Sequence, residues 1–179
     1  MGLDASRDFV AVRIAVLTVS DTRDIGEDRS GAVLAERLQA AGHRVAARAM
    51  VRDEQADIEA RLRAWIADPA VDAVISTGGT GLTGRDVTVE AHAAVYEKAI
   101  PAFGVLFTML SHAKIGTSAV QSRACAGVAG GTYLFALPGS PGACRDAWDG
   151  ILAAQLDYRH RPCNFVEIMP RLEEHRRRK

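Results

Sequence analysis

The feature that most constrains the fold of this chain is a regular alternation of short apolar runs and longer amphipathic segments. The apolar runs predict strands over residues 13–19, 43–51, 71–77 and 132–139. The segments between and after them predict helices over residues 30–42, 53–69, 87–99 and 140–156. Strands that are apolar almost throughout are typical of a parallel sheet covered on both faces. The sequence therefore predicts an α/β fold, a three-layer α/β/α sandwich with a mostly parallel central sheet.

The predicted helices carry recognisable boundary signals. Ser30 is predicted to cap the first helix and Gly42 to end it, and Pro69 closes the second. Four apolar side chains share one face of the second helix: Ile58, Leu62, Trp65 and Ile66.

Residues 101–131 are harder to assign from the pattern. Residues 102–116 and 118–130 are interpreted as two short helices. The apolar face of the first is predicted to pack on another subunit and consists of Phe103, Leu106, Phe107 and Leu110.

The charge balance and the cysteine count exclude several classes of protein. The chain has 22 basic and 22 acidic side chains among 179 residues, which argues against a general nucleic-acid binder. The three cysteines, Cys125, Cys144 and Cys163, are far apart and are predicted to be buried, reduced thiols, and no histidine spacing indicates zinc. No apolar run reaches the roughly 18 residues of a membrane span, and no signal peptide is expected. We expect a single cytoplasmic domain over residues 1–179, with its core at about 13–165.

A glycine-rich loop follows the third predicted strand. Gly79, Gly81 and Gly84 match the dinucleotide pattern G-x-G-x-x-G, but the acidic strand end expected about 20 residues later is missing. That absence disfavours a nicotinamide dehydrogenase. The loop also half-matches the triphosphatase pattern, except that Arg85 replaces the lysine and Asp86 replaces the hydroxyl residue. A main-chain cradle for phosphate is the interpretation that remains.

The two acidic residues near predicted helix starts each have two interpretations. Asp86 either caps the helix that begins near Val87 or shares Mg²⁺ with phosphate oxygens. Asp53, taken alone, is more often a helix cap than a metal ligand.

Polar residues follow the other predicted strands, where ligands collect in parallel sheets. Ser20 and Asp21 end the first strand, and Asp21 either contacts a bound ligand or metal or forms a simple turn. Gly139 and Ser140 lie at the start of the last predicted helix and would present donors to a phosphate, while Ser140 can also cap that helix. Arg85 either neutralises phosphate charge or forms a surface ion pair.

Three segments in this order resemble a known family. "LTVSDTR", "TGGTGLTGRDVT" and "ALPGSPGACRDAW" are similar to the signature segments of the MoaB/MogA family of molybdenum cofactor biosynthesis proteins, the molybdopterin adenylyltransferases. The resemblance covers residue 13 to about residue 165, and its middle and last parts are closest to the MoaB branch.

The resemblance implies a reaction and an assembly. The reaction is transfer of AMP from Mg-ATP to the terminal phosphate of molybdopterin, giving adenylyl-molybdopterin and pyrophosphate. The assembly is a homotrimer or hexamer, with other molybdenum cofactor biosynthesis proteins as further partners and no nucleic acid or membrane. The alternative is a non-catalytic protein that binds or carries molybdopterin in the same pathway.

The resemblance also implies site residues. Asp53 and Asp86 fall on the two acids of active members and would be catalytic and hold Mg²⁺, and because some MoaB-type sequences lack the first, its presence favours an active enzyme. Residues expected to bind substrate are Ser20, Asp21, Gly78, Gly79, Thr80, Gly81, Thr88, Gly139 and Ser140. Thr88 would add a hydroxyl contact or would only cap its helix.

Overall fold

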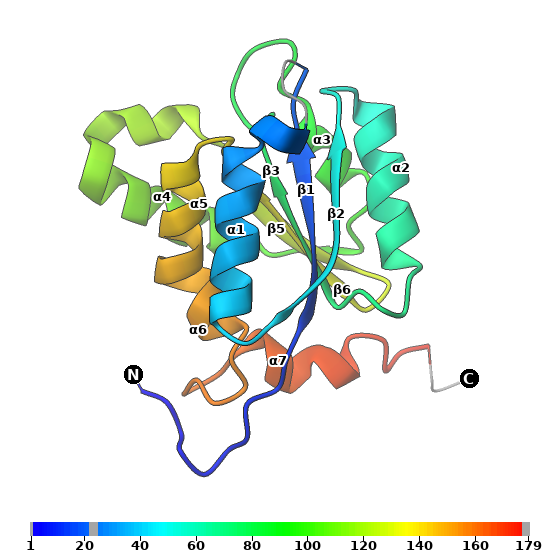
Figure 1. The fold of residues 1–179 in the computed structure, drawn as a ribbon, viewed down its shortest axis with the longest axis vertical. Coiled ribbons are helices and arrows are strands. Elements are labelled where there is room, and N and C mark those ends of the chain that lie inside the picture. Colours follow the sequence, from blue (N-terminus) through cyan, green and yellow to red (C-terminus); the bar gives the residue numbers. More distant parts are fainter. Residues whose placement is uncertain (1, 22–24, 177–179) are drawn as a thin grey trace.

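One six-stranded sheet forms the centre of the molecule in the computed structural model, which describes residues 2–21 and 25–176 (Figure 1). The strand order is β2-β1-β3-β6-β5-β4. Strands β1, β2, β3 and β6 are parallel, β5 is antiparallel to β6, and β4 is antiparallel to β5. The strands are β1 (Arg13–Val19), β2 (Arg44–Val51), β3 (Ala73–Thr77), β4 (Lys98–Ala99), β5 (Cys125–Ala129) and β6 (Thr132–Leu137).

Helices cover both faces of this sheet. On one face lie α1 (Arg29–Ala40), α4 (Pro101–Ile115) and α5 (Pro141–Ala147), and on the other lie α2 (Gln55–Ile66) and α3 (Thr88–Ala93) (Figure 1). A π-helical turn, η3 (Trp148–Leu152), continues α5 into α6 (Ala153–Gln155). The remaining short elements are η1 (Ile25–Glu27), η2 (Gly116–Gln121), α7 (Phe165–Ile168) and η4 (Met169–Arg171). The predicted three-layer sandwich with a mostly parallel sheet is confirmed.

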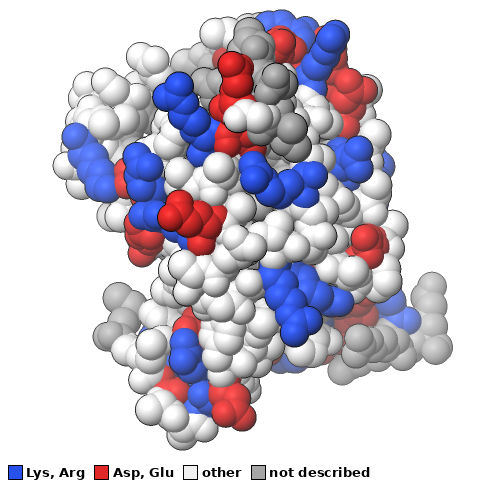
Figure 2. Space-filling model, in the orientation of Figure 1, with Lys and Arg blue, Asp and Glu red and all other residues white. Residues whose placement is uncertain are grey.

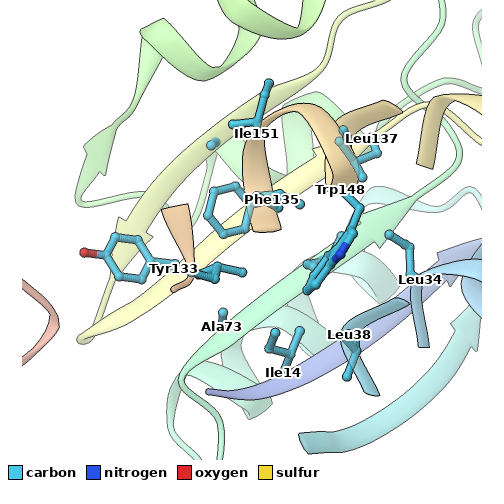
Figure 3. Close-up of a cluster of buried hydrophobic side chains, with 14 of the residues drawn as sticks. Ile14, Leu34, Leu38, Ala73, Tyr133, Phe135, Leu137, Trp148 and Ile151 are labelled. Carbon is cyan, nitrogen blue, oxygen red and sulfur yellow. The ribbon is translucent and has the colours of Figure 1, made fainter. Parts of the chain in front are cut away.

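Two apolar cores lie on the two faces of the sheet. Successive strand side chains point to opposite faces, so Ile14 joins the core beneath α1 and α5 while Leu17 joins the core beneath α2. The first core contains Phe135 of β6 and Trp148 of η3, together with Leu34 and Leu38 of α1 (Figure 3). In the second core, the predicted face of α2 contributes Ile58, Leu62 and Trp65. Because both faces are covered, β1, β3 and β6 are buried at nearly every position and consist mostly of apolar residues, whereas the edge strand β2 begins with alternating exposed and half-buried residues.

The interpretation of residues 118–130 as a helix is correct only for the part that lies in η2 and is wrong for residues 125–129. Residues 125–129 form β5, which pairs with β6 through a hairpin. The turn is made by Gly130 and Gly131, with φ of 54° and 80°, which are angles that glycine adopts without strain. The long-range pairing with β6 outweighs the local pattern, and the adjacent glycines were the signal for the turn. The helix predicted over residues 87–99 is also shorter than expected, because Lys98 and Ala99 pair with β5 as β4.

The first helix is capped by Asp28 and not by Ser30. The Asp28 carboxylate accepts a hydrogen bond of 2.8 Å from the amide of Gly31, whereas Ser30 lies inside the first turn. The chain leaves the helix through Gly42, whose φ is 92°. The predicted end of this helix is thus confirmed and its predicted cap is corrected.

The face of α4 assigned to another subunit needs correction. Phe103 and Phe107 are buried against the sheet of their own chain. Leu106 is exposed and Leu110 is partly buried against the same core. Helix α4 therefore uses its aromatic side chains internally, because its other neighbours on this face, α1 and α5, leave the β5–β6 region uncovered.

The cysteines are free but not all buried. Cys144 is buried, Cys125 is half-buried and Cys163 is exposed. The expectation of buried thiols is therefore correct for Cys144 alone, because Cys163 lies in the connection before α7. None of the helices formed by the described residues combines the length and apolar character that crossing a membrane requires.

Candidate active site at the carboxyl ends of the parallel strands

The loops that follow β1, β3 and β6 converge at one end of the sheet. The amide of Gly78 donates to the carbonyl of Leu137 at 3.0 Å, joining the second loop to the third. A Cβ on Gly78 would lie 2.1 Å from the carbonyl oxygen of Val19, and one on Gly139 would lie 3.1 Å from the Cα of Gly78. The three backbones approach so closely that only glycine fits at residue 78, whose φ is also 106°.

Two neighbouring pockets open where these loops meet. The smaller, of about 240 Å³, is lined by Thr18, Val19, Ser20, Asp21, Ser30, Asp53, Thr77, Gly78, Gly79 and Gly139. The larger, of about 370 Å³, is lined by Gly79, Thr80, Gly81, Asp86, Ser118, Gln121, Ser122, Pro138 and Gly139. Gly79 and Gly139 belong to both. The structure thus gathers the predicted site residues around these two pockets, with the exception of Thr88 and Ser140.

Gly79 lies close to both Asp53 and Thr88. Its φ is 62°, and a Cβ at this position would lie 2.4 Å from Thr88 Oγ1 and 2.7 Å from Asp53 Oδ1. Its carbonyl accepts a hydrogen bond of 2.9 Å from the amide of Thr88. Within the described part of the chain the buried Thr88 hydroxyl has no hydrogen-bond partner. Thr88 therefore lies behind the glycine loop and not on the pocket surface, and its hydroxyl does not cap α3.

The Asp53 carboxylate has no ion-pair partner among the described residues. The N-cap residue of α2 is Glu54, so Asp53 is not the cap that its position suggested. Its amide donates to Asp21 Oδ1 at 3.1 Å, and a hydrogen bond from the main-chain amide of Asp21 to the Asp53 carboxylate lowers the pKa of Asp53 in part. Burial, and after it the nearby charge of Asp21, raises the pKa of Asp53. This is the arrangement expected of a carboxylate that binds a cation.

Asp86 is held by its own loop. Its Oδ2 accepts hydrogen bonds from the amide and the hydroxyl of Thr83, at 2.8 Å and 2.7 Å. These bonds lower the pKa of Asp86, the hydroxyl of Thr83 having the largest effect. The N-cap residue of α3 is Val87 and no side chain caps that helix, so the interpretation of Asp86 as a cap is wrong. The loop turns back before α3 begins, and the Asp86 carboxylate forms its hydrogen bonds with Thr83 of the loop and none with the first turn of the helix.

Arg85 links two of the loops through ion pairs. Its Nε donates to Asp21 Oδ2 at 2.9 Å, and its Nη1 lies 2.9 Å from Glu54 Oε1. These contacts lower the pKa of Asp21. Figure 2 shows acidic and basic side chains next to one another across the viewed face. In this structure Arg85 therefore forms the surface ion pair that the sequence offered as one alternative.

Ser140 is the N-cap of α5. Its hydroxyl oxygen accepts a hydrogen bond of 3.1 Å from the amide of Ala143, and Pro141 occupies the first helical position. The capping role predicted for Ser140 is confirmed, while its neighbour Gly139 forms part of both pockets.

One wall of the larger pocket was missed from the sequence. It is formed by Ser118, Gln121 and Ser122, which lie in or directly after η2. A 3₁₀ helix has three residues per turn, so Ser118 and Gln121 lie on the same side. The Ser122 hydroxyl is buried and has no hydrogen-bond partner among residues 2–21 and 25–176. Polar residues within an otherwise apolar segment were the available signal.

The donors at this site fit one kind of metal better than others. No group of three or more His, Cys, Asp or Glu side chains that could hold an ion occurs in the described residues. Mg²⁺ commonly takes only one or two carboxylates, completed by phosphate oxygens and water. Asp53 and Asp86, lining neighbouring pockets, match that requirement, and the lack of an ion pair between Asp53 and any described residue is the observation that favours a cation.

The fold and the pockets define an α/β protein with a glycine-rich loop and two pockets at the carboxyl ends of its parallel strands. A family described as "Probable molybdopterin binding domain" matches residues 15–158. The chain belongs to this family, and within it to the MoaB/MogA group of molybdenum cofactor biosynthesis proteins.

Individual relatives support this assignment. The chain is 49% identical over 160 residues to "Molybdenum cofactor biosynthesis protein B" of Escherichia coli (strain K12), an alignment that covers 89% of this chain and 94% of the relative. A crystal structure of "Molybdenum cofactor biosynthesis protein B" matches with a TM-score of 0.84 at 37% identity, covering 94% of this chain and 99% of the other. A solved structure of MogA matches with a TM-score of 0.70 at 31% identity, covering 80% of this chain and 97% of the other.

Proposed function

We propose that this protein transfers AMP from Mg-ATP to the terminal phosphate of molybdopterin, giving adenylyl-molybdopterin and pyrophosphate. The observation that carries the proposal is the Asp53 carboxylate, which has no ion-pair partner among the described residues and lies next to Gly79, where two pockets meet. A cation and a phosphate chain bound there would compensate its charge. The names of the relatives, which place those proteins in molybdenum cofactor biosynthesis, support molybdopterin as the acceptor.

The reaction makes modest demands on the protein. An oxygen of the molybdopterin phosphate attacks the α-phosphorus of ATP, and the bond from that phosphorus to the bridging oxygen breaks. Pyrophosphate leaves with the electron pair of this bond. The attacking phosphate is already largely ionised at neutral pH, so no general base is required. Catalysis then depends on alignment and on stabilisation of phosphate charge.

The site residues have roles that follow from their positions. Main-chain amides of the segment 79–81 and of Gly139 would cradle phosphate between the two pockets, with Ser20 and Thr80 adding hydroxyl groups, while Gly78 would keep the loop in place through its bond to Leu137. Asp53 and Asp86 would hold Mg²⁺, which would offset phosphate charge in the complex. Asp21 would fix Arg85 near the phosphates, where the guanidinium adds positive charge.

The roles of Thr88 and Ser140 are more indirect. Because Thr88 lies behind Gly79, its unpaired hydroxyl would donate to a ligand oxygen only when the glycine loop shifts. Ser140 would keep the start of α5 in place beneath the bound phosphate.

A homotrimer, or a hexamer made of two trimers, belongs to the same proposal. Five of the exposed large apolar side chains lie on α4 and η2: Val105, Leu106, Met109, Ile115 and Val120. An apolar hollow of about 630 Å³ lies on the same surface. A second subunit would cover these side chains. Each subunit would be a single molybdopterin-binding domain in the cytoplasm, working with other proteins of the pathway.

The direct test is product formation by the purified protein. Molybdopterin and Mg-ATP are mixed with it, and adenylyl-molybdopterin and pyrophosphate are separated by chromatography and quantified. We expect stoichiometric formation of both products. Asp86→Asn should still bind pterin but turn over at least ~100-fold more slowly, a loss of about 2.7 kcal/mol in transition-state stabilisation.

Two outcomes would contradict the proposal. Undiminished turnover by Asp86→Asn would remove Asp86 from the catalytic residues. Pterin binding by the wild-type protein without any product would favour the alternative of a molybdopterin carrier.

A further inference from the structure

Arg123 forms a set of contacts with the glycine-rich loop that its position in the sequence did not suggest. Its Nε donates to the carbonyl of Gly81 at 2.8 Å, and its Nη2 donates to the carbonyl of Asp86 at 2.9 Å. Its own amide donates to the carbonyl of Thr80 at 3.3 Å. The guanidinium also forms an ion pair with Glu90 on α3. One residue therefore binds both ends of the loop 80–86 and the helix that follows it.

These contacts connect the two opposing walls of the larger pocket. One wall is the loop 79–86, which includes Asp86. The other consists of Ser118, Gln121 and Ser122, and Arg123 directly follows it. The bonds between Asp86 and Thr83 hold the loop to itself, and the bonds from Arg123 to Gly81 and Asp86 hold the loop to the other wall. The Arg123 side chain thus joins the two walls of the pocket.

We infer that Arg123 is a positioning residue, which fixes the loop carrying Asp86 against the wall formed by residues 118–122. This inference rests on the proposed adenylyl transfer for its catalytic consequence. Arg123 is not among the residues that line either pocket, so it acts through the loop and not on the ligand.

The chemistry of the contacts explains why an arginine is needed. The planar guanidinium presents several N–H donors in fixed directions, so it reaches two carbonyl groups and a carboxylate at once. A lysine ammonium on a flexible stem would keep the charge but would not hold all three acceptors in this geometry. The side chain is 31% exposed, so these hydrogen bonds are partly shielded from water.

The carbonyl contacts are separable from the ion pair. Glu90 has a half-exposed side chain and contributes an ion pair of the surface type, which is typically worth less than about 1 kcal/mol. Glu90→Gln removes that pair and leaves the bonds to Gly81 and Asp86 in place. Arg123→Gln removes both kinds of contact. Comparison of the two variants isolates the contribution of the carbonyl bonds.

The test uses the full chain in four variants with two measurements. Arg123→Gln, Arg123→Lys and Glu90→Gln are compared with Arg37→Gln, which removes an ion pair to Asp149 on the far side of α1. Amide hydrogen exchange reports on residues 81–86, and steady-state kinetics with molybdopterin and Mg-ATP reports kcat and KM. Circular dichroism checks that each variant is folded. If Arg123→Gln does not fold, Arg123→Lys is used for both measurements in its place.

We expect Arg123→Gln to lower kcat about 30-fold, with KM for Mg-ATP changed less than about 3-fold, because misplaced groups mainly affect alignment. In Arg123→Gln the amide hydrogens of residues 81–86 should exchange at least about 10-fold faster than in the wild-type protein, since the loop opens locally more often. Arg123→Lys should fall between Arg123→Gln and wild type in both measurements. Glu90→Gln and Arg37→Gln should match wild type.

Three results would overturn the inference. They are normal exchange in Arg123→Gln, normal kcat despite faster exchange, or an equal loss in Glu90→Gln. If the wild-type protein forms no adenylyl-molybdopterin, the proposed function fails. The exchange measurement still decides whether Arg123 holds the loop.

Discussion

The two aspartates of the candidate site lie in different electrostatic surroundings. Asp86 receives two hydrogen bonds from Thr83, which lower its pKa. Asp53 forms no ion pair with the described residues, and burial together with the charge of Asp21 raises its pKa. Asp86 is therefore stabilised by its own loop, whereas Asp53 is a charge that the free protein holds at some cost. Such a cost is typical of residues kept for function.

Asp53→Asn is predicted to raise the melting temperature at about pH 7. The pKa of Asp53 is higher in the folded state than in the unfolded state, so the wild-type protein loses stability as the pH rises through the pKa of the folded state. The asparagine does not ionise, so the advantage of the variant should grow from about pH 3 to about pH 7. Thermal unfolding at several pH values measures this difference. Asp86→Asn is the matched control and should lower the melting temperature at neutral pH, because it removes a stabilised charge. A lower melting temperature for Asp53→Asn at neutral pH would contradict the argument.

Gly79→Ala is predicted to destabilise the protein and to weaken Mg-ATP binding. Its φ of 62° disfavours any side chain, and the new methyl group would meet Thr88 Oγ1 at 2.4 Å and Asp53 Oδ1 at 2.7 Å. We expect a loss of about 1–3 kcal/mol in the free energy of unfolding, measured with urea. Gly84→Ala is the control in the same loop, because a Cβ there meets nothing within 4 Å. Equal effects of the two substitutions would show that crowding at Gly79 is not the cause.

At the scale of the element, the start of α1 depends on a residue outside the helix. The Asp28 carboxylate accepts hydrogen bonds from the amide of Gly31, from Thr18 Oγ1 at 2.8 Å and from Arg48 Nη2 at 2.9 Å. Asp28 is 6% exposed, so these bonds form largely away from water. One side chain thus joins the helix to β1 and β2.

Asp28→Ala is predicted to lower the free energy of unfolding by about 2–4 kcal/mol, because it removes a cap and leaves two buried donors unpaired. Ser30→Ala, at the residue that the sequence pattern proposed as the cap, should cost less than about 1 kcal/mol. Urea unfolding of both variants gives the comparison. A larger loss for Ser30→Ala would restore the cap predicted from the sequence.

The predicted elements were correct for strands that are buried on both faces of the sheet. They were wrong where pairing with a distant strand determines the secondary structure. The runs that became β1, β3 and β6 are apolar at nearly every residue, and no other element of that length fits them. The segment that became β5 has small residues with no clear period, "CAGVA". Such a segment is a strand only because β6 supplies hydrogen-bond partners on one side. Local sequence carries no record of that pairing beyond the two glycines of the turn.

At the scale of the whole molecule, the exposed apolar side chains on α4 and η2 remain to be explained. Val120 is 78% exposed and Met109 is 64% exposed. The aromatic residues of α4 face inward, so the predicted contact with another subunit moves to the opposite side of the helix. The proposed trimer or hexamer would bury this surface.

Val120→Glu is predicted to dissociate the assembly, because a charge buried in an apolar interface is costly. Sedimentation equilibrium should show a multiple of the chain mass for the wild-type protein and a lower mass for the variant. Ile168→Glu, at an exposed apolar residue of α7, should leave the mass unchanged. A monomeric wild-type protein, or an unchanged mass for Val120→Glu, would contradict the proposed interface.

The candidate site was predicted in part. The loops after β1, β3 and β6 were expected to meet, since parallel strands end at the same edge of the sheet, and they do. Ser118, Gln121, Ser122 and Arg123 were not expected there. Their segment reaches the pocket by way of α4 and η2, and nothing in its local pattern indicates that route.

The sequence by itself determined the layered α/β architecture, the family and the three loops that carry the site, because apolar periodicity and glycine spacing are local properties. Only the tertiary structure decided what each polar residue does. The state of a carboxylate depends on its neighbours in space: Asp53 forms no ion pair with the described residues, Asp86 is held by Thr83, and Arg123 joins the two walls. Electrostatic and hydrogen-bond energies depend on distances in space, which the order of residues does not specify.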